Sequence, residues 1–128
     1  SFTDVASSAW YYGYIQTAVG YGIVNGYGDG TYGPNDTITR EQAMTMIARA
    51  MKITKLAPTL KDSQITSLLS TYTDASGISD YAKASVAACI ETGVVLGRPH
   101  NTVASKDFIT RAEVAVIVER MLQKSGLI

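Results

Sequence analysis

Two stretches of the chain are near copies of each other, DTITREQAMTMIARAM from Asp36 to Met51 and DFITRAEVAVIVERM from Asp107 to Met121. Their aligned threonines, Thr39 and Thr110, lie 71 positions apart. A long match at one fixed offset is the mark of an internal repeat, and repeats of this length indicate one structural unit used twice. The sequence therefore predicts that the fold is built from two equivalent units.

Each copy carries the signals of a helix start. Thr39 and Thr110 are residue types that cap helices, and Gln42 and Glu113 follow three positions later. This is the capping-box pattern, in which each partner binds a backbone N–H that the helix leaves unpaired. Apolar residues at helical spacing come next. We expect a helix over about residues 39–51 and its twin 71 positions later.

The arginines that follow the threonines are not explained by capping. Arg40 and Arg111 fall in the first helical turn, where the positive end of the helix dipole disfavours a cation by about 0.3–1 kcal/mol. An arginine beside unpaired helix N–H groups forms an anion-binding site, which is one interpretation. The other is an internal salt bridge, to Asp4 or Asp74.

The 71-residue offset extends beyond the two helices. It pairs Trp10 with Tyr81, Gly22 with Gly93 and Gly26 with Gly97. We therefore divide the chain into a repeat at 1–52, a connector with a short helix at 53–71, and a second repeat at 72–128.

Each repeat reads as a helix, a tight loop and a second helix. Ser7 or Ser8 is placed to cap the first helix of repeat 1, and Gly22 to end it. Ser79 and Gly93 are placed to do the same in repeat 2. In the connector, Ile65, Leu68 and Leu69 are expected to face inward. The fold is predicted to be mainly α, with short extended pieces at most.

Composition limits the function classes. The 128 residues include 11 basic and 11 acidic side chains, so the net charge is zero and a nucleic-acid partner is not expected. No apolar run is long enough for a membrane span. The single cysteine, Cys89, lies in an apolar stretch and is expected to be buried and inert. No cluster of cysteines and histidines indicates a metal, and no cofactor is expected.

The combined motifs resemble the S-layer homology (SLH) repeat. Repeat 1 carries SFTDV, a helix tryptophan, GIVNG, DGTYGP and ITREQ, and repeat 2 carries YTDA, GVVLG and ITRAE. Repeat 2 departs from the family pattern with Tyr81 in place of the tryptophan and HNT in place of DGT. The resemblance implies a pseudo-threefold helical bundle of three repeats, of which this chain looks like the last two.

The resemblance also implies a function and a site. SLH modules anchor surface-layer proteins and exoenzymes to bacterial cell walls without covalent bonds, so an extracellular, wall-bound location is expected. The usual ligand is a secondary cell-wall polysaccharide bearing ketal-pyruvylated N-acetylmannosamine, held in grooves between repeats. Carried onto this sequence, the glycan-binding residues are the arginines Arg40 and Arg111 for the carboxylate, Asp4 and Asp74 for sugar hydroxyls or to orient the arginines, Trp10 and Tyr81 as flat walls, Gly26 and Gly97 for close backbone approach, and Arg98 as a weaker candidate.

Plainer roles stay open for several of these residues. Trp10 sits at helical spacing, which is also typical of a core residue, and the two aspartates can simply cap the turns that follow them. Arg49 and Arg120 lie near helix C-termini, where a cation is stabilising, so we expect stability to be their role.

Three other functions can be compared with the sequence. A calcium loop at residues 25–36 lacks ligands, because Asp29 and Asp36 are its only carboxylates. An enzyme is not expected, since no catalytic set of residues is apparent. A protein–protein module for surface-layer assembly is the main alternative to the glycan anchor. Two repeats out of three would leave apolar faces uncovered, which predicts a third repeat or an oligomer partner.

Overall fold

The computed structural model describes residues 2–55, 57–94 and 100–127, and it is mainly helical as predicted. Two three-residue strands and two short 3-10 turns complete the regular structure of this part of the chain. In chain order the elements are α1 (Tyr12–Gly20), β1 (Thr37–Thr39), α2 (Arg40–Ile53), α3 (Asp62–Ser70), η1 (Ala75–Gly77), η2 (Asp80–Ala82), α4 (Lys83–Glu91), β2 (Phe108–Thr110) and α5 (Arg111–Lys124).

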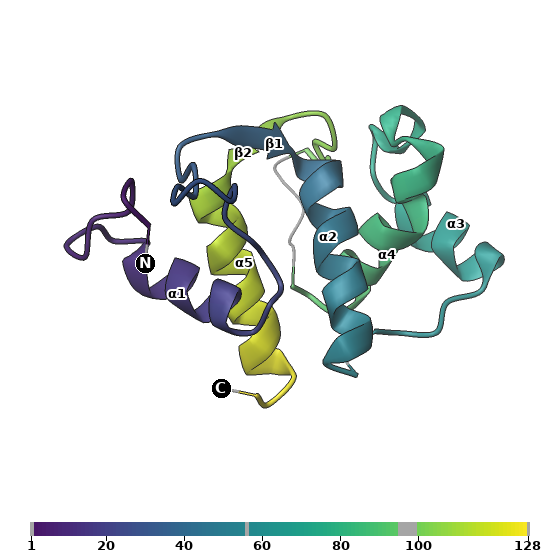
Figure 1. Cartoon of the computed structure of the whole chain (residues 1–128). Coiled ribbons are helices and arrows are strands. Elements are labelled where there is room, and N and C mark those ends of the chain that lie inside the picture. Colours follow the sequence, from purple (N-terminus) through teal and green to yellow (C-terminus); the bar gives the residue numbers. More distant parts are fainter. Residues whose placement is uncertain (1, 56, 95–99, 128) are drawn as a thin grey trace.

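The first helix of each repeat packs on the second helix of the other repeat. The first helix of repeat 1, α1, packs on α5 of repeat 2, and α4 of repeat 2 packs on α2 of repeat 1 (Figure 1). Above both pairs, β1 and β2 form an antiparallel ribbon in which Ile38 lies opposite Ile109, its own equivalent. The two repeats are therefore related by a local twofold arrangement, and the pseudo-threefold bundle stays a prediction.

One apolar core runs through both helix pairs. It includes the thiol of Cys89, whose burial raises its pKa to about 12, so the prediction of an inert, buried cysteine is confirmed. The largest fully buried side chains are Ile15, Tyr32, Met44, Ile47, Met51, Val86, Val94, Val103, Val114, Val118, Met121 and Leu122.

The capping boxes predicted for the second helices are confirmed. The Oγ1 of Thr39 accepts from the N–H of Gln42 at 3.2 Å, and the Gln42 side chain accepts in return from the N–H of Thr39 at 2.9 Å. Thr110 and Glu113 repeat both bonds at the start of α5. The α2 helix extends to Ile53, two residues beyond the predicted end.

The expected cap of α1 is wrong, and the expected cap in repeat 2 is correct in position only. Helix α1 begins only at Tyr12, because backbone turns such as Tyr12 N–H to Ala9 O shape the preceding segment, and Ser7 and Ser8 lie within it. In repeat 2, Ser79 is the N-cap residue of η2, which leads directly into α4, but its side chain makes no capping hydrogen bond. The predicted ends are confirmed, since both helices stop just before Gly22 and Gly93, each at φ +72°.

The connector helix is also confirmed. Helix α3 packs on α4, with Leu69 buried and Ile65 and Leu68 half-buried. The inward face predicted from the spacing of these three residues is therefore correct.

The loops before the strands turn at equivalent left-handed residues. Gly33 has φ +71°, and its equivalent Ala104 has φ +56°. A side chain with a Cβ in this region costs about 1–2 kcal/mol. Repeat 2 therefore carries local strain that repeat 1 avoids.

Replacing Ala104 with glycine should relieve this strain. We expect Ala104→Gly to raise the free energy of unfolding by about 0.5–1 kcal/mol, since the relief exceeds the entropy that glycine adds to the unfolded chain. Urea unfolding measures the change. The reciprocal Gly33→Ala should destabilise, because its Cβ would meet Asp36 Oδ2 and the Tyr27 ring at 2.5 Å. A lower unfolding midpoint for Ala104→Gly would contradict the account.

Candidate ligand-binding site

The two predicted aspartates hold the loops of their own repeats. The Asp4 carboxylate accepts hydrogen bonds from the N–H groups of Tyr32 and Gly33, both at 2.8 Å, and these bonds lower its pKa. Asp74 accepts equivalent bonds from residues 103–104, also at 2.8 Å. Both carboxylates thus bind loops 28–30 residues away, so the expectation that they cap the turns directly after them is wrong. Contact of these carboxylates with a sugar stays a prediction.

Arg111 reaches across into the loop of repeat 1. Its Nε donates to the carbonyl of Tyr32 at 2.8 Å, and its Nη2 donates to the carbonyl of Asn25 at 2.6 Å. The guanidinium lies 4.7 Å from the ring centroid of Tyr27 and 4.4 Å from that of Tyr32. Carbonyls and aromatic rings, both favourable to a cation, therefore fix the position of this half-buried side chain.

Arg40 makes the equivalent crossing in the other direction. Its Nε donates to the carbonyl of Val103 at 3.0 Å, and only 8% of the residue is exposed. Val103 is the equivalent of Tyr32, so each arginine binds the same carbonyl of the opposite repeat.

The helix starts beside these arginines are already filled by protein. The first two N–H groups of α2, those of Arg40 and Glu41, donate to the carbonyls of Asp107 and Ser105 at 2.8 and 2.9 Å. The first two N–H groups of α5 donate to the carbonyls of Asp36 and Pro34 in the same way. The expectation that each arginine stands beside unpaired helix N–H groups is therefore wrong, and the helix ends offer no anion site.

A groove between the repeats brings together Trp10 and Arg40, two of the predicted residues. Its volume of about 310 Å³ lies at the lower end of the range for small-molecule sites. Trp10 is 64% exposed, so the alternative of a core tryptophan is wrong. The groove is lined by Trp10, Arg40, Ile109, Glu113, Val116, Ile117 and Arg120.

Arg120 is a groove residue that the sequence analysis assigned to helix stability. It lines the groove with Glu113 and Ile117, and it donates from Nη1 to the carbonyl of Val94 at 3.2 Å. The signal was present in the spacing, since positions 113, 116, 117 and 120 share one face of a helix. All four line the groove, and they form a wall of apolar and charged groups beside Arg40.

The corresponding place in repeat 2 has different chemistry. Tyr81 is 60% exposed, like its equivalent Trp10, but its hydroxyl is hydrogen-bonded to Glu41. The Glu41 carboxylate, 3% exposed, also accepts from the N–H of Ser79 at 3.1 Å and from Lys106 Nζ at 3.0 Å. Burial alone would raise the pKa of Glu41, but these bonds outweigh it and lower the pKa to about 2.

Gly26 is needed for packing inside its own repeat. A Cβ at this position would collide with the ring of Phe2 and stand 2.9 Å from the carbonyl of Thr31. A role of its backbone in binding stays a prediction. The two remaining candidates, Gly97 and Arg98, lie outside the described residues.

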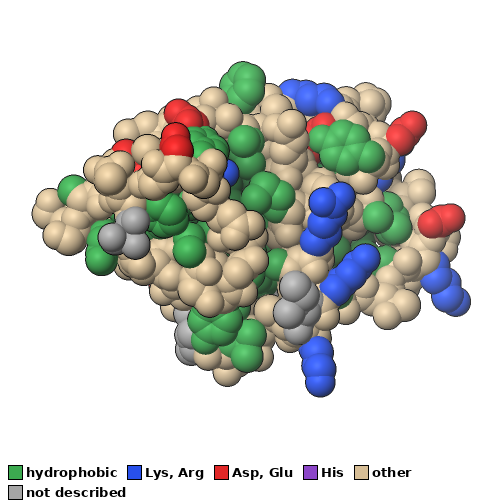
Figure 2. Space-filling view, in the orientation of Figure 1, with side chains coloured by type: hydrophobic (Ala, Val, Ile, Leu, Met, Phe, Trp, Pro, Cys, Tyr) green, Lys and Arg blue, Asp and Glu red, His purple; other side chains and the backbone are tan. Residues whose placement is uncertain are grey.

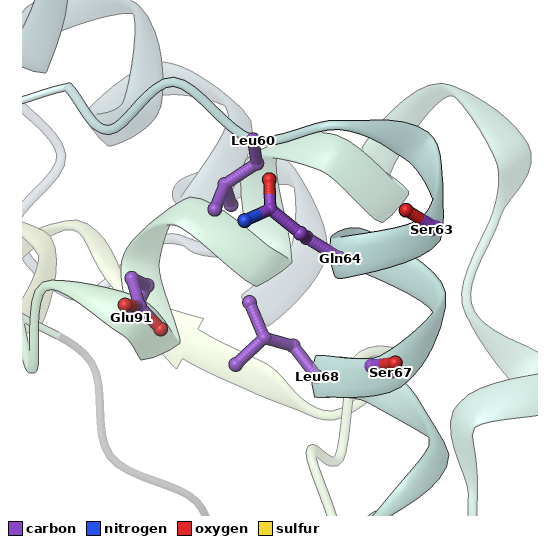
Figure 3. A pocket seen from close by; sticks show the side chains of 6 residues that line it. All are labelled: Leu60, Ser63, Gln64, Ser67, Leu68 and Glu91. Atoms are coloured by element: carbon purple, nitrogen blue, oxygen red, sulfur yellow. The ribbon is translucent and has the colours of Figure 1, made fainter.

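Another cleft, of about 330 Å³, lies along the connector helix. Gln64 and Leu68 point from α3 toward Glu91 on α4, and Leu60, Ser63 and Ser67 complete the lining (Figure 3). None of the predicted glycan-binding residues lines it. This cleft lies where the connector helix packs against repeat 2. The candidate ligand-binding site is therefore the groove beside Trp10.

Other kinds of site find little support. The described residues contain no group of three or more His, Cys, Asp or Glu side chains that could hold a metal ion. Within the same residues, no helix is both long and apolar enough to cross a bilayer. On the face shown in Figure 2, the basic side chains stand mostly over the α2–α4 half of the molecule.

Two helix–loop–helix repeats that pack on each other, with a groove between them, define the class of domains built from tandem helical repeats. The chain belongs to the S-layer homology domain family, whose pattern matches residues 1–44 and 71–115. This match confirms the two repeats, and with the surface-layer relatives it places the chain among proteins of the bacterial cell wall. The exact domain limits stay a prediction.

Similar chains occur in large proteins of different kinds. The chain is 40% identical, over 98% of its length, to an amylopullulanase of Thermoanaerobacterium thermosulfurigenes. It is 39% identical, over 98% of its length, to the exoglucanase XynX of Acetivibrio thermocellus. It is 28% identical, over 96% of its length, to the surface-layer 125 kDa protein of Lysinibacillus sphaericus. The chain spans only 6%, 11% and 10% of these relatives.

The buried Glu41 should make stability depend on acid pH. Its folded pKa lies below the usual value of 4.5, so its contribution is complete above pH 4.5 and is lost as the pH falls toward 2. We expect Glu41→Gln to cost about 2–3 kcal/mol at pH 7 and to flatten the pH dependence of urea unfolding in this window.

Glu91→Gln, at an exposed glutamate, is the matched control and should change little. Equal pH profiles for the wild type and Glu41→Gln would show that Glu41 is not the group responsible.

Proposed function

We propose that this chain attaches a larger protein to the bacterial cell wall by binding an acidic secondary cell-wall polysaccharide without covalent bonds. The ligand group is a ketal-pyruvylated N-acetylmannosamine. The observation that carries the proposal is the groove between the repeats, which is lined by the exposed ring of Trp10 and by Arg40.

The groove suits a sugar that bears a carboxylate. The flat ring of Trp10 offers an apolar surface for one face of a sugar. Guanidinium groups bind carboxylates through charge-assisted hydrogen bonds, often two at a time. Glu113, exposed at the helix start, adds an acceptor for hydroxyl or amide groups of the glycan.

The same groove does not suit glycoside hydrolysis. Most glycosidases use two carboxyl groups on either side of the scissile bond. Glu113 is the one carboxylate among the residues that line this groove. We therefore propose a non-catalytic role for this chain, and any enzyme activity would belong to other parts of a longer protein.

Removing the Trp10 ring from the groove should weaken binding to the cell-wall polymer while leaving the fold intact. We expect Trp10→Ala to reduce affinity for purified pyruvylated wall polymer by about 2 kcal/mol, roughly thirtyfold. Isothermal titration calorimetry measures this loss, and pulldown on sacculi with and without the polymer tests the ligand class. Phe108→Ala removes an equally exposed aromatic outside the groove, at 68% exposure, and should bind normally. Retention by polymer-free sacculi would favour a protein or peptidoglycan partner.

The carboxylate should be the decisive group on the ligand. We expect Arg40→Ala, which removes a guanidinium from the groove, to cost about 1.5–3 kcal/mol of binding, as for a lost charge-assisted hydrogen bond. Chemical removal of the pyruvate should abolish binding to the wild-type protein. Full affinity in this variant, with folding verified by circular dichroism, would overturn the assignment of the carboxylate to Arg40.

A further inference from the structure

The groove beside Trp10 follows α5 over about two helical turns, from Glu113 to Arg120. Glu113 and Arg120 both line it and lie seven residues apart on the same helix. At 1.5 Å per residue, this separation is about 10 Å along the helix axis. Arg40 stands at the Glu113 end, because its N–H binds the carbonyl of Asp107 just before β2 and α5.

Arg120 is a cation held in place at the far end of this wall. Its Nη1 donates to the carbonyl of Val94, which fixes one side of the guanidinium, while the residue as a whole stays exposed. A guanidinium has five N–H donors, so one bond leaves much of its capacity for a ligand. Helix stability does not require this cation, since Lys124 already occupies the last turn of α5.

The equivalent residue of repeat 1 provides a natural comparison. Arg49 lies 71 positions earlier, is also exposed, and occupies the same position on α2 that Arg120 occupies on α5. Only Arg120 lines the groove that holds Trp10 and Arg40. If both arginines served only helix stability, replacing either one with alanine should have the same effect on glycan affinity. If Arg120 contacts the ligand in this groove, only its replacement should lower that affinity.

We propose that the groove binds at least two consecutive sugar units, and that Arg120 binds an acidic or hydroxyl group of the unit next to the one held by Arg40. This inference rests on the proposed function. It makes the ligand an oligosaccharide segment of the wall polymer rather than one terminal sugar, and it makes Arg120 the residue that recognises the second unit.

The test compares two ligands on the same protein. The probes are the methyl glycoside of ketal-pyruvylated N-acetylmannosamine and a tetrasaccharide cut from pyruvylated wall polymer, both titrated by calorimetry. We expect the wild type to bind the tetrasaccharide about tenfold more tightly than the monosaccharide. Arg120→Ala should lose most of this gain while its affinity for the monosaccharide stays within about twofold, as for one lost charge-assisted bond. Arg49→Ala should behave as the wild type with both probes.

Each outcome separates the two proposals. If Arg120→Ala lowered the affinity for both probes equally, Arg120 would contact the first sugar. The proposal that Arg120 binds a second sugar unit would then be overturned. No loss on either probe, or the same loss in Arg49→Ala, would overturn the inference while leaving the proposed function standing. Binding of neither probe by the wild-type protein would instead overturn the proposed function. Arg120→Lys, which keeps the charge, should restore part of the affinity for the tetrasaccharide and leave thermal unfolding unchanged.

Discussion

The structure depends on a reciprocal exchange of backbone hydrogen bonds between its two repeats. Every α-helix leaves the N–H groups of its first turn without partners inside the helix. In this chain the first two N–H groups of α2 bind carbonyls of the repeat 2 loop, and those of α5 bind carbonyls of the repeat 1 loop. A buried N–H without a partner costs about 1–3 kcal/mol. The second helix of each repeat therefore depends on the loop of the other repeat for the partners of its first two N–H groups while this helix start stays buried.

This exchange also explains why a cation stands where the helix dipole disfavours one. The dipole cost is about 0.3–1 kcal/mol. Against it, the Nε of Arg40 and the Nε of Arg111 each donate to a carbonyl of the opposite loop, and a hydrogen bond to a charged group contributes about 1.5–3 kcal/mol. Because the hydrogen bond outweighs the dipole cost, the arginine is favoured even without a ligand. Structural support therefore accounts for the position of both arginines, and a role of Arg40 in ligand binding stays a proposal.

The sequence predicted several features that short-range signals encode, although not the start of α1. The capping boxes at Thr39 and Thr110, the glycine stops and the inward face of α3 all depend on residues within a few positions of one another. The exchange of loops could not be predicted, because a repeat offset shows that two units are alike and not which surface of each meets the other. The pairing of Asp4 with loop N–H groups 28 and 29 residues away was missed for the same reason.

The two repeats share a scaffold and differ in the side chains that surround it. Glu41, bound to Ser79 and Lys106, has Ala112 as its equivalent, where no such cluster can form. The Trp10 groove carries Glu113 where repeat 1 has Gln42, and both residues serve equally as capping partners. Because capping accepts either residue, this position is free to change the charge of a groove without loss of the helix start. The repeated capping box thus keeps the same backbone arrangement in both repeats, while such exchangeable positions let the charge of the two surfaces differ.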